Sequence, residues 1–329
     1  MIITKTPLRI SFCGGGTDLA AFYERAGYGA VLSTSIDKYV YLAIHRYFEN
    51  KFLLKYSTIE LTDTVGEIKH PLIRECLKLH GIEEPLEVTS FADIPASGSG
   101  LGSSSAFSVG LLHACSAFKG QMPSKETLAS NACEVEIERV GEPIGKQDQY
   151  AVAYGGLNLI RFNADGSTWI EPVILPKGVK AEIEGRLLLF YTGITRNASS
   201  ILSEQRSKTQ DDKGTYQVLL KIRDQAEKLR IELAAGNSDS LGHLLHEGWQ
   251  LKRQISTGIT SPRLDDIYNR AVSAGALGGK LLGAGGGGFF LFYCHADRQG
   301  AVRTALQDLR EVRFGMENQG TRIIFVEES

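Results

Sequence analysis

The sequence predicts an α+β protein with two domains. The chain has 329 residues, enough for two folded units, although single domains of this size also occur. Runs with strand-like alternation and runs with helical periodicity follow one another along it. The composition becomes turn-rich at 162–168 and shifts again at 176–178, so we expect one domain over 1–175 and a second over 176–329.

The composition narrows the class of protein. Hydrophobic residues make up 43% and charged residues 22%, as in ordinary globular proteins, and a net charge of −2 gives no reason to expect nucleic acid or an anionic membrane as a partner. The five cysteines are scattered and form no C-x-x-C pair, which disfavours disulfides and structural zinc. The chain shows no secretory segment and no apolar run long enough to span a membrane, so we expect a soluble cytoplasmic protein.

The segment 95–107 carries the clearest functional signal. It lies between the strand-like run 86–94 and the apolar, helix-like run 106–118. Its glycines and serines are Gly98, Gly100, Gly102, Ser103, Ser104 and Ser105. Glycines that lead into a helix N-terminus expose backbone N–H groups to an anion, which predicts a phosphate cradle. A plain flexible loop is the alternative, and the apolar flanks and the absence of charge disfavour it.

Two further segments contain an aspartate that could act in a binding or catalytic site. The strand-like run 8–12 ends in three glycines before Asp18, whose carboxylate could bind hydroxyl groups or could cap the helix expected from Leu19. Asp148 stands between Gln147 and Gln149. It could be a helix N-cap, or a general base held by the two amide side chains, and spacing does not decide between these.

Helical periodicity singles out Glu136 in the helix expected over 124–141. At about 100° per residue, Glu136 falls in the middle of the apolar arc, whereas Glu134 and Glu138 fall on the solvent side. A buried carboxylate must be paired, protonated or bound to a metal. The two alternatives are an intrahelical pair with Arg139 and a metal site shared with Ser104.

The second half of the chain shows one more glycine cluster. Lys280 precedes five glycines that run into the strand expected at 289–294. Amphipathic helices are expected near 216–235 and 239–256, and the polar stretch 207–215 before them is predicted to be a loop. His243, His246 and Glu247 lack the spacing of a zinc motif, so a solvated helix face is the preferred interpretation.

Three segments in this order resemble the motifs of the GHMP small-molecule kinases, the family of galactokinase, homoserine kinase and mevalonate kinase. They are Pro7-Leu-Arg-Ile-Ser-Phe-Cys-Gly-Gly-Gly-Thr-Asp18, Pro95-Ala-Ser-Gly-Ser-Gly-Leu-Gly-Ser-Ser-Ser-Ala106 and Lys280-Leu-Leu-Gly-Ala-Gly-Gly-Gly-Gly288. The first of them and Gly145-Lys-Gln-Asp-Gln-Tyr150 look most like bacterial D-glycero-D-manno-heptose 7-phosphate kinases and related fucose kinases. Galactokinases carry Gly-Glu-His-Thr-Asp where this chain has Gly14-Gly-Gly-Thr-Asp18, which argues against galactose as the substrate.

The resemblance implies a fold and a set of site residues. The N-terminal domain would be like domain 2 of ribosomal protein S5, the C-terminal domain ferredoxin-like, and the active site would lie in the cleft between them. Asp148 would accept the proton of the sugar hydroxyl, Arg9 would keep Asp148 ionised, and Ser104 with Glu136 would hold Mg²⁺. The residues implied to bind the ATP phosphates are Pro95, Gly98, Ser99, Gly100, Leu101, Gly102, Ser103 and Ser104. Those implied for the substrate are Gly15, Gly16, Asp18, Lys146, Arg196, Lys280 and Gly285, with Arg196 and Lys146 as candidates for a phosphate already on the sugar.

The implied reaction is the transfer of a phosphoryl group from ATP to the anomeric hydroxyl of D-glycero-D-manno-heptose 7-phosphate. Another sugar 1-kinase, such as one for L-fucose, is the first alternative. A sugar-sensing protein that kept the fold without the chemistry is the second. The expected partners are therefore a small sugar phosphate and ATP, and the oligomeric state stays open, a homodimer included.

Overall fold

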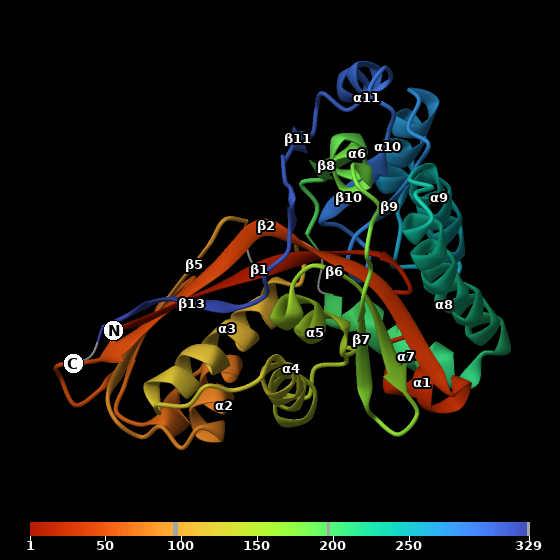
Figure 1. The fold of residues 1–329 in the computed structure, drawn as a ribbon. Coiled ribbons are helices and arrows are strands. Elements are labelled where there is room, and N and C mark those ends of the chain that lie inside the picture. Colours follow the sequence, from red (N-terminus) through yellow and green to blue (C-terminus); the bar gives the residue numbers. More distant parts are fainter. Residues whose placement is uncertain (95–97, 196–197, 328–329) are drawn as a thin grey trace.

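The computed structural model describes residues 1–94, 98–195 and 198–327. It contains two β-sheets, and helices pack against each of them (Figure 1). The first sheet runs across the molecule with a layer of helices on one face, and the second sheet with its helices stands over one end of it. None of the described helices is long and apolar enough to cross a membrane.

The first sheet is organised around the long strand β2. Within the described residues its strands are β1 (Ile2–Cys13), β2 (Tyr28–Arg46), β3 (Phe52–Lys55), β4 (Ile59–Thr62), β5 (Leu86–Ala92), β6 (Leu157–Asn163), β7 (Thr168–Pro172), β12 (Met316–Glu317) and β13 (Arg322–Val326). β1 runs antiparallel along β2, while β6 and β5 pair with the first and second halves of β2. The helices α3, α5 and α8 all pack against β1 and β2, which explains the nearly continuous burial of these two strands.

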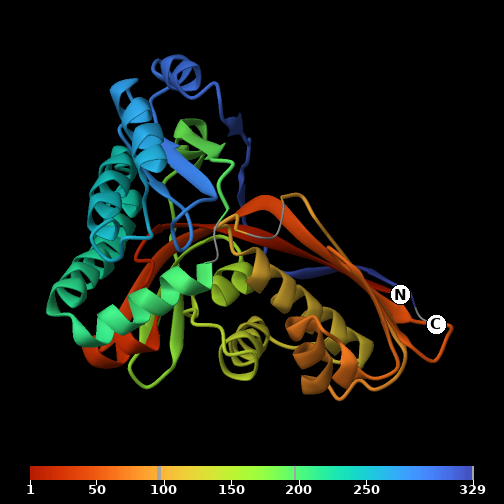
Figure 2. The same cartoon turned by 180° about the vertical axis from the view of Figure 1, so that it is seen from behind.

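The last strand of the chain returns to the first sheet. β13 pairs antiparallel with β1, so the two ends of the chain lie side by side, as both Figure 1 and Figure 2 show. β12 likewise pairs with β2. Although β13 is the last strand along the chain, it lies in the sheet of the N-terminal part. The boundary near residue 175 stays a prediction, and these last strands do not stay with the second sheet.

The helices of the N-terminal part cover one face of the first sheet (Figure 1). They are α1 (Ala20–Ala26), α2 (Pro71–Leu79), α3 (Ser103–Phe118), α4 (Lys125–Cys133), a π-helix (Glu134–Arg139) and α5 (Gln147–Tyr154), with a short 3₁₀ turn at Val65–Glu67. α3 is apolar nearly all round because it packs against β1 and β2 on one side and against α2, α4 and α5 on the others. Its N-terminus therefore has a fixed position at the end of the glycine-rich loop.

The second sheet and its helices form the C-terminal part. The strands are β8 (Leu187–Tyr191), β9 (Gly278–Leu281), β10 (Phe289–Tyr293) and β11 (Arg310–Glu311). The helices are α6 (Val179–Arg186), α7 (Ala198–Asp211), α8 (Lys213–Ala234), α9 (Asp239–Lys252), α10 (Pro262–Ser273) and α11 (Gln299–Ala305). The loop expected over 207–215 is wrong. α7 continues to Asp211, and Asp212 caps α8 by accepting hydrogen bonds from the N–H groups of Gly214 and Thr215.

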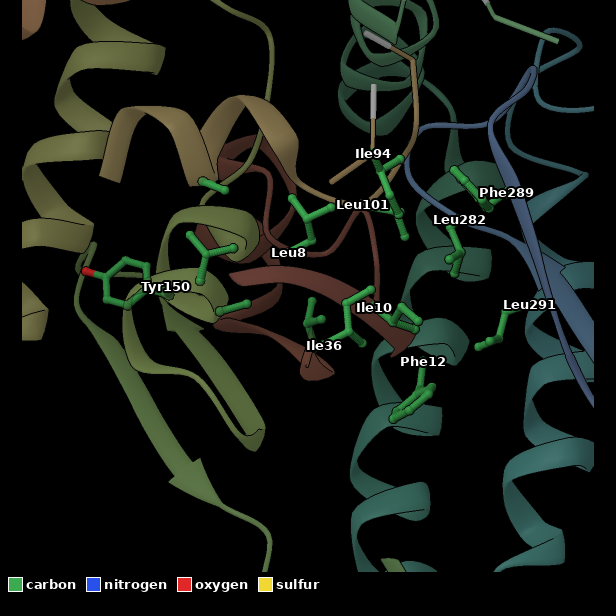
Figure 3. Packing of buried hydrophobic residues seen from close by; sticks show 14 of the residues in the cluster. Leu8, Ile10, Phe12, Ile36, Ile94, Leu101, Tyr150, Leu282, Phe289 and Leu291 are labelled. Atoms are coloured by element: carbon green, nitrogen blue, oxygen red, sulfur yellow. The ribbon is translucent and has the colours of Figure 1, made fainter. Parts of the chain in front are cut away.

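A single apolar core connects the two parts. Leu8, Ile10 and Phe12 of β1 belong to the same buried cluster as Leu282 and Phe289 (Figure 3). Leu101, which lies between two glycines of the loop, is fully buried in this cluster. Burying such a side chain contributes about 2–3 kcal/mol, so the loop is held in place by its leucine while its glycines remain free to face a ligand.

Candidate active site

The glycine-rich loop adopts a backbone that only glycine accommodates readily. Gly98, Gly100 and Gly102 have φ values of 71°, 74° and 75°, in the left-handed region. A Cβ at Gly100 would lie 2.5 Å from the carbonyl oxygen of Leu282, and one at Gly102 would lie 3.0 Å from Cγ of Arg9. The glycines are thus required both by φ and by close packing, which favours a packed loop over the flexible-loop alternative for the described part.

The glycine cluster of the C-terminal part packs directly against this loop. A Cβ at Gly283 would meet Cα of Gly100 at 2.5 Å, and one at Gly288 would meet the carbonyl oxygen of Ser99 at 2.6 Å. Two glycine-rich segments far apart in the sequence therefore approach backbone to backbone. This contact connects the phosphate-cradle candidate to the second sheet.

The N-terminus of α3 carries no side-chain cap. Gly102 occupies the N-cap position, so no side chain accepts from the first N–H groups of the helix. The hydroxyl of Ser103 bonds to that of Ser99 at 3.0 Å, and Ser99 also accepts from the N–H of Leu101 at 3.3 Å. The side chain of Ser104 is exposed. Uncapped N–H groups, the helix dipole and a glycine-bounded approach together suit a phosphate group.

Arg9 and Asp148 form a two-point ion pair beside the loop. Nε and Nη2 of Arg9 donate to the two oxygens of Asp148 at 2.7 Å and 2.5 Å, and Nη1 donates to the carbonyl oxygen of Gly100 at 2.6 Å. Arg9 is buried at 4% exposure, whereas Asp148 retains 24%. The pair therefore leaves part of the Asp148 carboxylate accessible and ties it to the glycine-rich loop through one guanidinium.

The structure tests the two roles that spacing left open for Asp148, a helix N-cap and a base held by the flanking amide side chains. Asp148 lies in the first turn of α5, whose N-cap is Lys146, so it is not itself the cap. The flanking amide of Gln147 does not hold it either. That amide donates to Asp18 at 3.0 Å and accepts from the hydroxyl of Ser11 at 3.0 Å. The alternative in which the flanking amides hold Asp148 is therefore wrong, whereas the pairing with Arg9 that the family resemblance implies is present.

The predicted burial of Glu136 is confirmed, and the alternative in which it pairs with Arg139 is wrong. Glu136 is 1% exposed, and its Oε2 accepts from the hydroxyls of Ser105 at 3.1 Å and Ser104 at 3.4 Å. Arg139 instead pairs with Glu134 at 2.6 Å on the surface. The segment is a π-helix rather than the expected α-helix, with wider hydrogen bonding such as Val140 N–H to the carbonyl of Val135. Such π turns are frequent at functional sites.

The chemistry of Glu136 fits a divalent cation. Its Oε1 is buried and has no hydrogen-bond partner among the described residues. Burial raises the pKa of this carboxyl to about 8. Mg²⁺ is commonly held by one or two carboxylates together with substrate phosphates, and a hydroxyl is a suitable further ligand. Glu136 and Ser104 are thus a fitting pair for Mg²⁺ next to a bound phosphate chain.

Asp18 is buried beside Asp148 and fastens the first glycine segment. Its Oδ1 accepts from the N–H of Gly16 at 2.9 Å, and its Oδ2 accepts from the N–H of Gln147 at 3.2 Å. Burial raises the pKa of Asp18, and the nearby charge of Asp148 acts in the same direction. The N-cap of α1 is Leu19, so the alternative role of Asp18 as a helix cap is wrong. Asp18 stands in the site, with its carboxylate already bound by the backbone.

A cavity lies next to these groups, between the two parts of the molecule. From the N-terminal part it is lined by residues that include Arg9, Gly15, Gly16, Asp18 and Asp148, and from the C-terminal part by Gln205, Lys252 and Lys280. The space in it that is accessible to the centre of a water molecule is about 90 Å³, and its walls come from both parts of the molecule.

Two lysines form the C-terminal wall of the cavity. Lys280 is 9% exposed and donates to the carbonyl oxygens of Ser11 at 3.0 Å and Phe12 at 3.1 Å. Lys252, the last residue of α9, donates to the carbonyl oxygen of Gly283. Lys280 was expected from the sequence and Lys252 was not. The missed signal is its spacing, because Lys252 follows the buried Leu245 by seven residues and so falls on the apolar side of α9.

Some predicted substrate residues lie elsewhere. The ammonium of Lys146 donates to the carbonyl oxygen of Gly166 at 3.0 Å, and Lys146 does not line the cavity. Gly285 has a φ of 115°, and a Cβ there would lie 2.9 Å from Cα of Ile259, so it serves backbone packing. Pro95 and Arg196 lie outside the described residues.

Comparison with known proteins agrees with this geometry. Residues 65–156 match the family model described as the GHMP kinases N terminal domain, and residues 229–311 match that of the GHMP kinases C terminal. The first match contains the glycine-rich loop, Glu136 and Asp148, and the second contains both cavity lysines.

Similar proteins and structures include sugar kinases. A D-glycero-alpha-D-manno-heptose 7-phosphate kinase of Campylobacter jejuni is 30% identical over 89% of this chain and 89% of its own length. An L-fucokinase/L-fucose-1-P guanylyltransferase of Bacteroides fragilis is 32% identical over 66% of this chain but only 23% of its own length. The crystal structure of a D-glycero-D-manno-heptose 1-phosphate kinase from Bacteroides thetaiotaomicron superposes over both whole chains with a TM-score of 0.81 at 22% identity, which establishes the two-domain fold. The chain therefore belongs to the GHMP kinase family, whose members transfer a phosphoryl group to an alcohol.

Proposed function

We propose that this kinase transfers the γ-phosphoryl group of ATP to the anomeric hydroxyl of D-glycero-D-manno-heptose 7-phosphate, giving the 1,7-bisphosphate. The observation that carries the proposal is the Arg9–Asp148 pair, which stands between the uncapped N-terminus of α3 and a cavity lined by both domains. In the proposed reaction this carboxylate acts between the loop that would bind the phosphates and the cavity that would hold the acceptor. The similarity to a heptose 7-phosphate kinase supports this choice of acceptor.

Each group has a defined task in the proposed reaction. The loop from Gly98 to Ser103 binds the phosphates of ATP through its N–H groups, and Asp148 orients the acceptor hydroxyl and accepts its proton. The guanidinium of Arg9 holds that carboxylate in position and offsets charge near the transferred group. Glu136 and Ser104 would hold Mg²⁺, which supplies charge neutralisation on the phosphates.

L-fucose is the alternative acceptor, favoured by the similarity to the L-fucokinase/L-fucose-1-P guanylyltransferase. The two acceptors differ in charge, because fucose lacks a phosphate. ADP release should be measured with the purified protein, ATP and Mg²⁺ over a panel of heptose 7-phosphate, unphosphorylated heptose, L-fucose and galactose. Turnover of heptose 7-phosphate with a kcat/KM at least about tenfold above that of fucose supports the first choice. Turnover of fucose without turnover of heptose 7-phosphate contradicts it.

A further inference from the structure

The cavity contains two ammonium groups whose hydrogen bonds go only to neutral acceptors in the described part of the chain. Lys280 donates to the carbonyls of Ser11 and Phe12, and Lys252 donates to the carbonyl of Gly283. The lysines that do form ion pairs in the same part of the chain are Lys38, Lys51, Lys55, Lys78 and Lys208. Lys252 and Lys280 are not among them, although both are turned toward a shared cavity.

The charges that line the cavity do not balance. Arg9 and Asp148 neutralise each other through their two-point pair. Asp18 then remains as the acid facing Lys252 and Lys280 among the lining residues, and its oxygens are already engaged by Gly16 and Gln147. Two ammonium groups therefore face one carboxylate, which leaves an excess of one positive charge among the lining residues.

Burial makes this excess unfavourable in the empty protein. Desolvation lowers the pKa of Lys280 to about 8 and that of Lys252 well below its ordinary value, and the mutual repulsion of the two ammonium groups lowers the pKa of Lys252 further. An uncompensated buried charge is unfavourable unless something offsets it. In a cavity between two domains, that role falls to a ligand anion. Two ammonium groups that line one cavity and can donate hydrogen bonds match a phosphate, which offers several acceptor oxygens.

We propose that Lys252 and Lys280 form a phosphate-binding position on the C-terminal wall of the acceptor cavity. This assignment rests on the proposed function in taking the cavity as the acceptor site, and it replaces Lys146, whose ammonium is directed to Gly166. The phosphate has two possible sources: the one already present on the acceptor sugar, and the phosphoryl group in transfer. Both have the same chemistry, and the kinetics of two acceptors separate them.

The test compares Lys252→Met with the wild-type enzyme on heptose 7-phosphate and on unphosphorylated heptose. Loss of a charge-assisted hydrogen bond should change the affected kinetic constant by about tenfold or more. A rise in KM for heptose 7-phosphate alone assigns the position to the phosphate of the acceptor. A fall in kcat with both acceptors assigns it to the transferred group. Either result should be partly rescued in Lys252→Arg, which restores a cation.

Lys221→Met is the matched control, because Lys221 is an exposed lysine on the neighbouring helix α8 and does not line the cavity. Replacing the buried ammonium by methionine removes an unpaired charge, so the variant should fold at least as stably as wild type. If Lys252→Met and Lys280→Met both keep KM and kcat within about twofold of the control on each acceptor, the proposal is refuted.

A binding experiment separates this proposal from the proposed function. Thermal stabilisation by millimolar inorganic phosphate, without nucleotide, should be smaller in Lys252→Met and Lys280→Met than in wild type and Lys221→Met. If the wild-type protein does not turn over heptose 7-phosphate, but phosphate stabilises it more than the two lysine variants, the lysine site stands and only the proposed substrate is refuted. Equal stabilisation of all four proteins refutes the lysine site, whatever the substrate.

Discussion

The replacement of Asp148 by asparagine tests the centre of the proposed mechanism. In the wild-type protein the carboxylate accepts from Nε and Nη2 of Arg9 at 2.7 Å and 2.5 Å, and Arg9 is 4% exposed. The asparagine side chain would present an NH₂ group to one of these donors and leave a buried guanidinium without a counter-charge. Breaking a buried pair in this way destabilises a protein by about 3–5 kcal/mol. The partial exposure of Asp148 favours the lower end of that range, so we expect a loss of about 3 kcal/mol.

A double-mutant cycle separates stability from catalysis. Arg9→Met combined with Asp148→Asn removes both charges, so most of the lost free energy of unfolding should return, whereas phosphoryl transfer should not. Loss of a positioned base lowers kcat by about 10²-fold or more. Urea unfolding gives the stability, and ADP release gives kcat. Glu134→Gln, which breaks the exposed pair with Arg139, is the control and should destabilise by less than about 1 kcal/mol. A double variant no more stable than Asp148→Asn, or transfer by Asp148→Asn within about tenfold of wild type, refutes the reasoning.

Three further changes report on the loop and the cavity. Gly102→Ala should weaken ATP binding and destabilise by about 1–2 kcal/mol or more, because φ is 75° and the new Cβ meets Arg9; Gly120→Ala, at a φ of 70° with open space around it, isolates the backbone contribution. Leu101→Ala should lower the free energy of unfolding by about 2–5 kcal/mol, because the leucine side chain is fully buried, and urea unfolding measures the loss. Burial holds the pKa of Lys280 at about 8, below its ordinary 10.5, so the unfolded chain binds the extra proton between these values. Wild-type stability should therefore rise from pH 8 to 10.5 by up to about 3 kcal/mol relative to Lys280→Met, and parallel urea curves for the two proteins would contradict this.

Helical periodicity was sufficient to predict the burial of a side chain where that burial depends on a single helix. Periodicity alone placed Glu136 on the buried side of its helix, and the structure confirms this. The same spacing argument applied to α9 would have found Lys252, which was overlooked in a helix interpreted as having a solvated face. Spacing left two alternatives open for Glu136, and the structure excludes the pair with Arg139, which instead binds Glu134 within the π-helical segment.

The sequence did not predict which partners the long charged side chains bind. Lys146 stands next to Gln147 in a motif that resembles the family, yet its ammonium goes to the carbonyl of Gly166, 20 residues away. A long side chain can reach many partners, and the packing of neighbouring elements selects among them. Arg9, by contrast, lies 139 residues from Asp148 in the chain, and it was the motif resemblance, not local spacing, that indicated their pairing.

The sequence by itself determined the strands near 8–12, 86–94 and 289–294, several helices and the glycine loop, because these depend on the alternation, periodicity and φ preferences of nearby residues. Gly98, Gly100 and Gly102 all adopt the positive φ that only glycine tolerates readily. The tertiary structure decided which distant elements meet: β13 with β1, Gly100 with Gly283, and the cavity shared by Asp18, Asp148 and the two lysines. These contacts depend on burying apolar faces of separate elements against one another, and no window of the sequence contains that information.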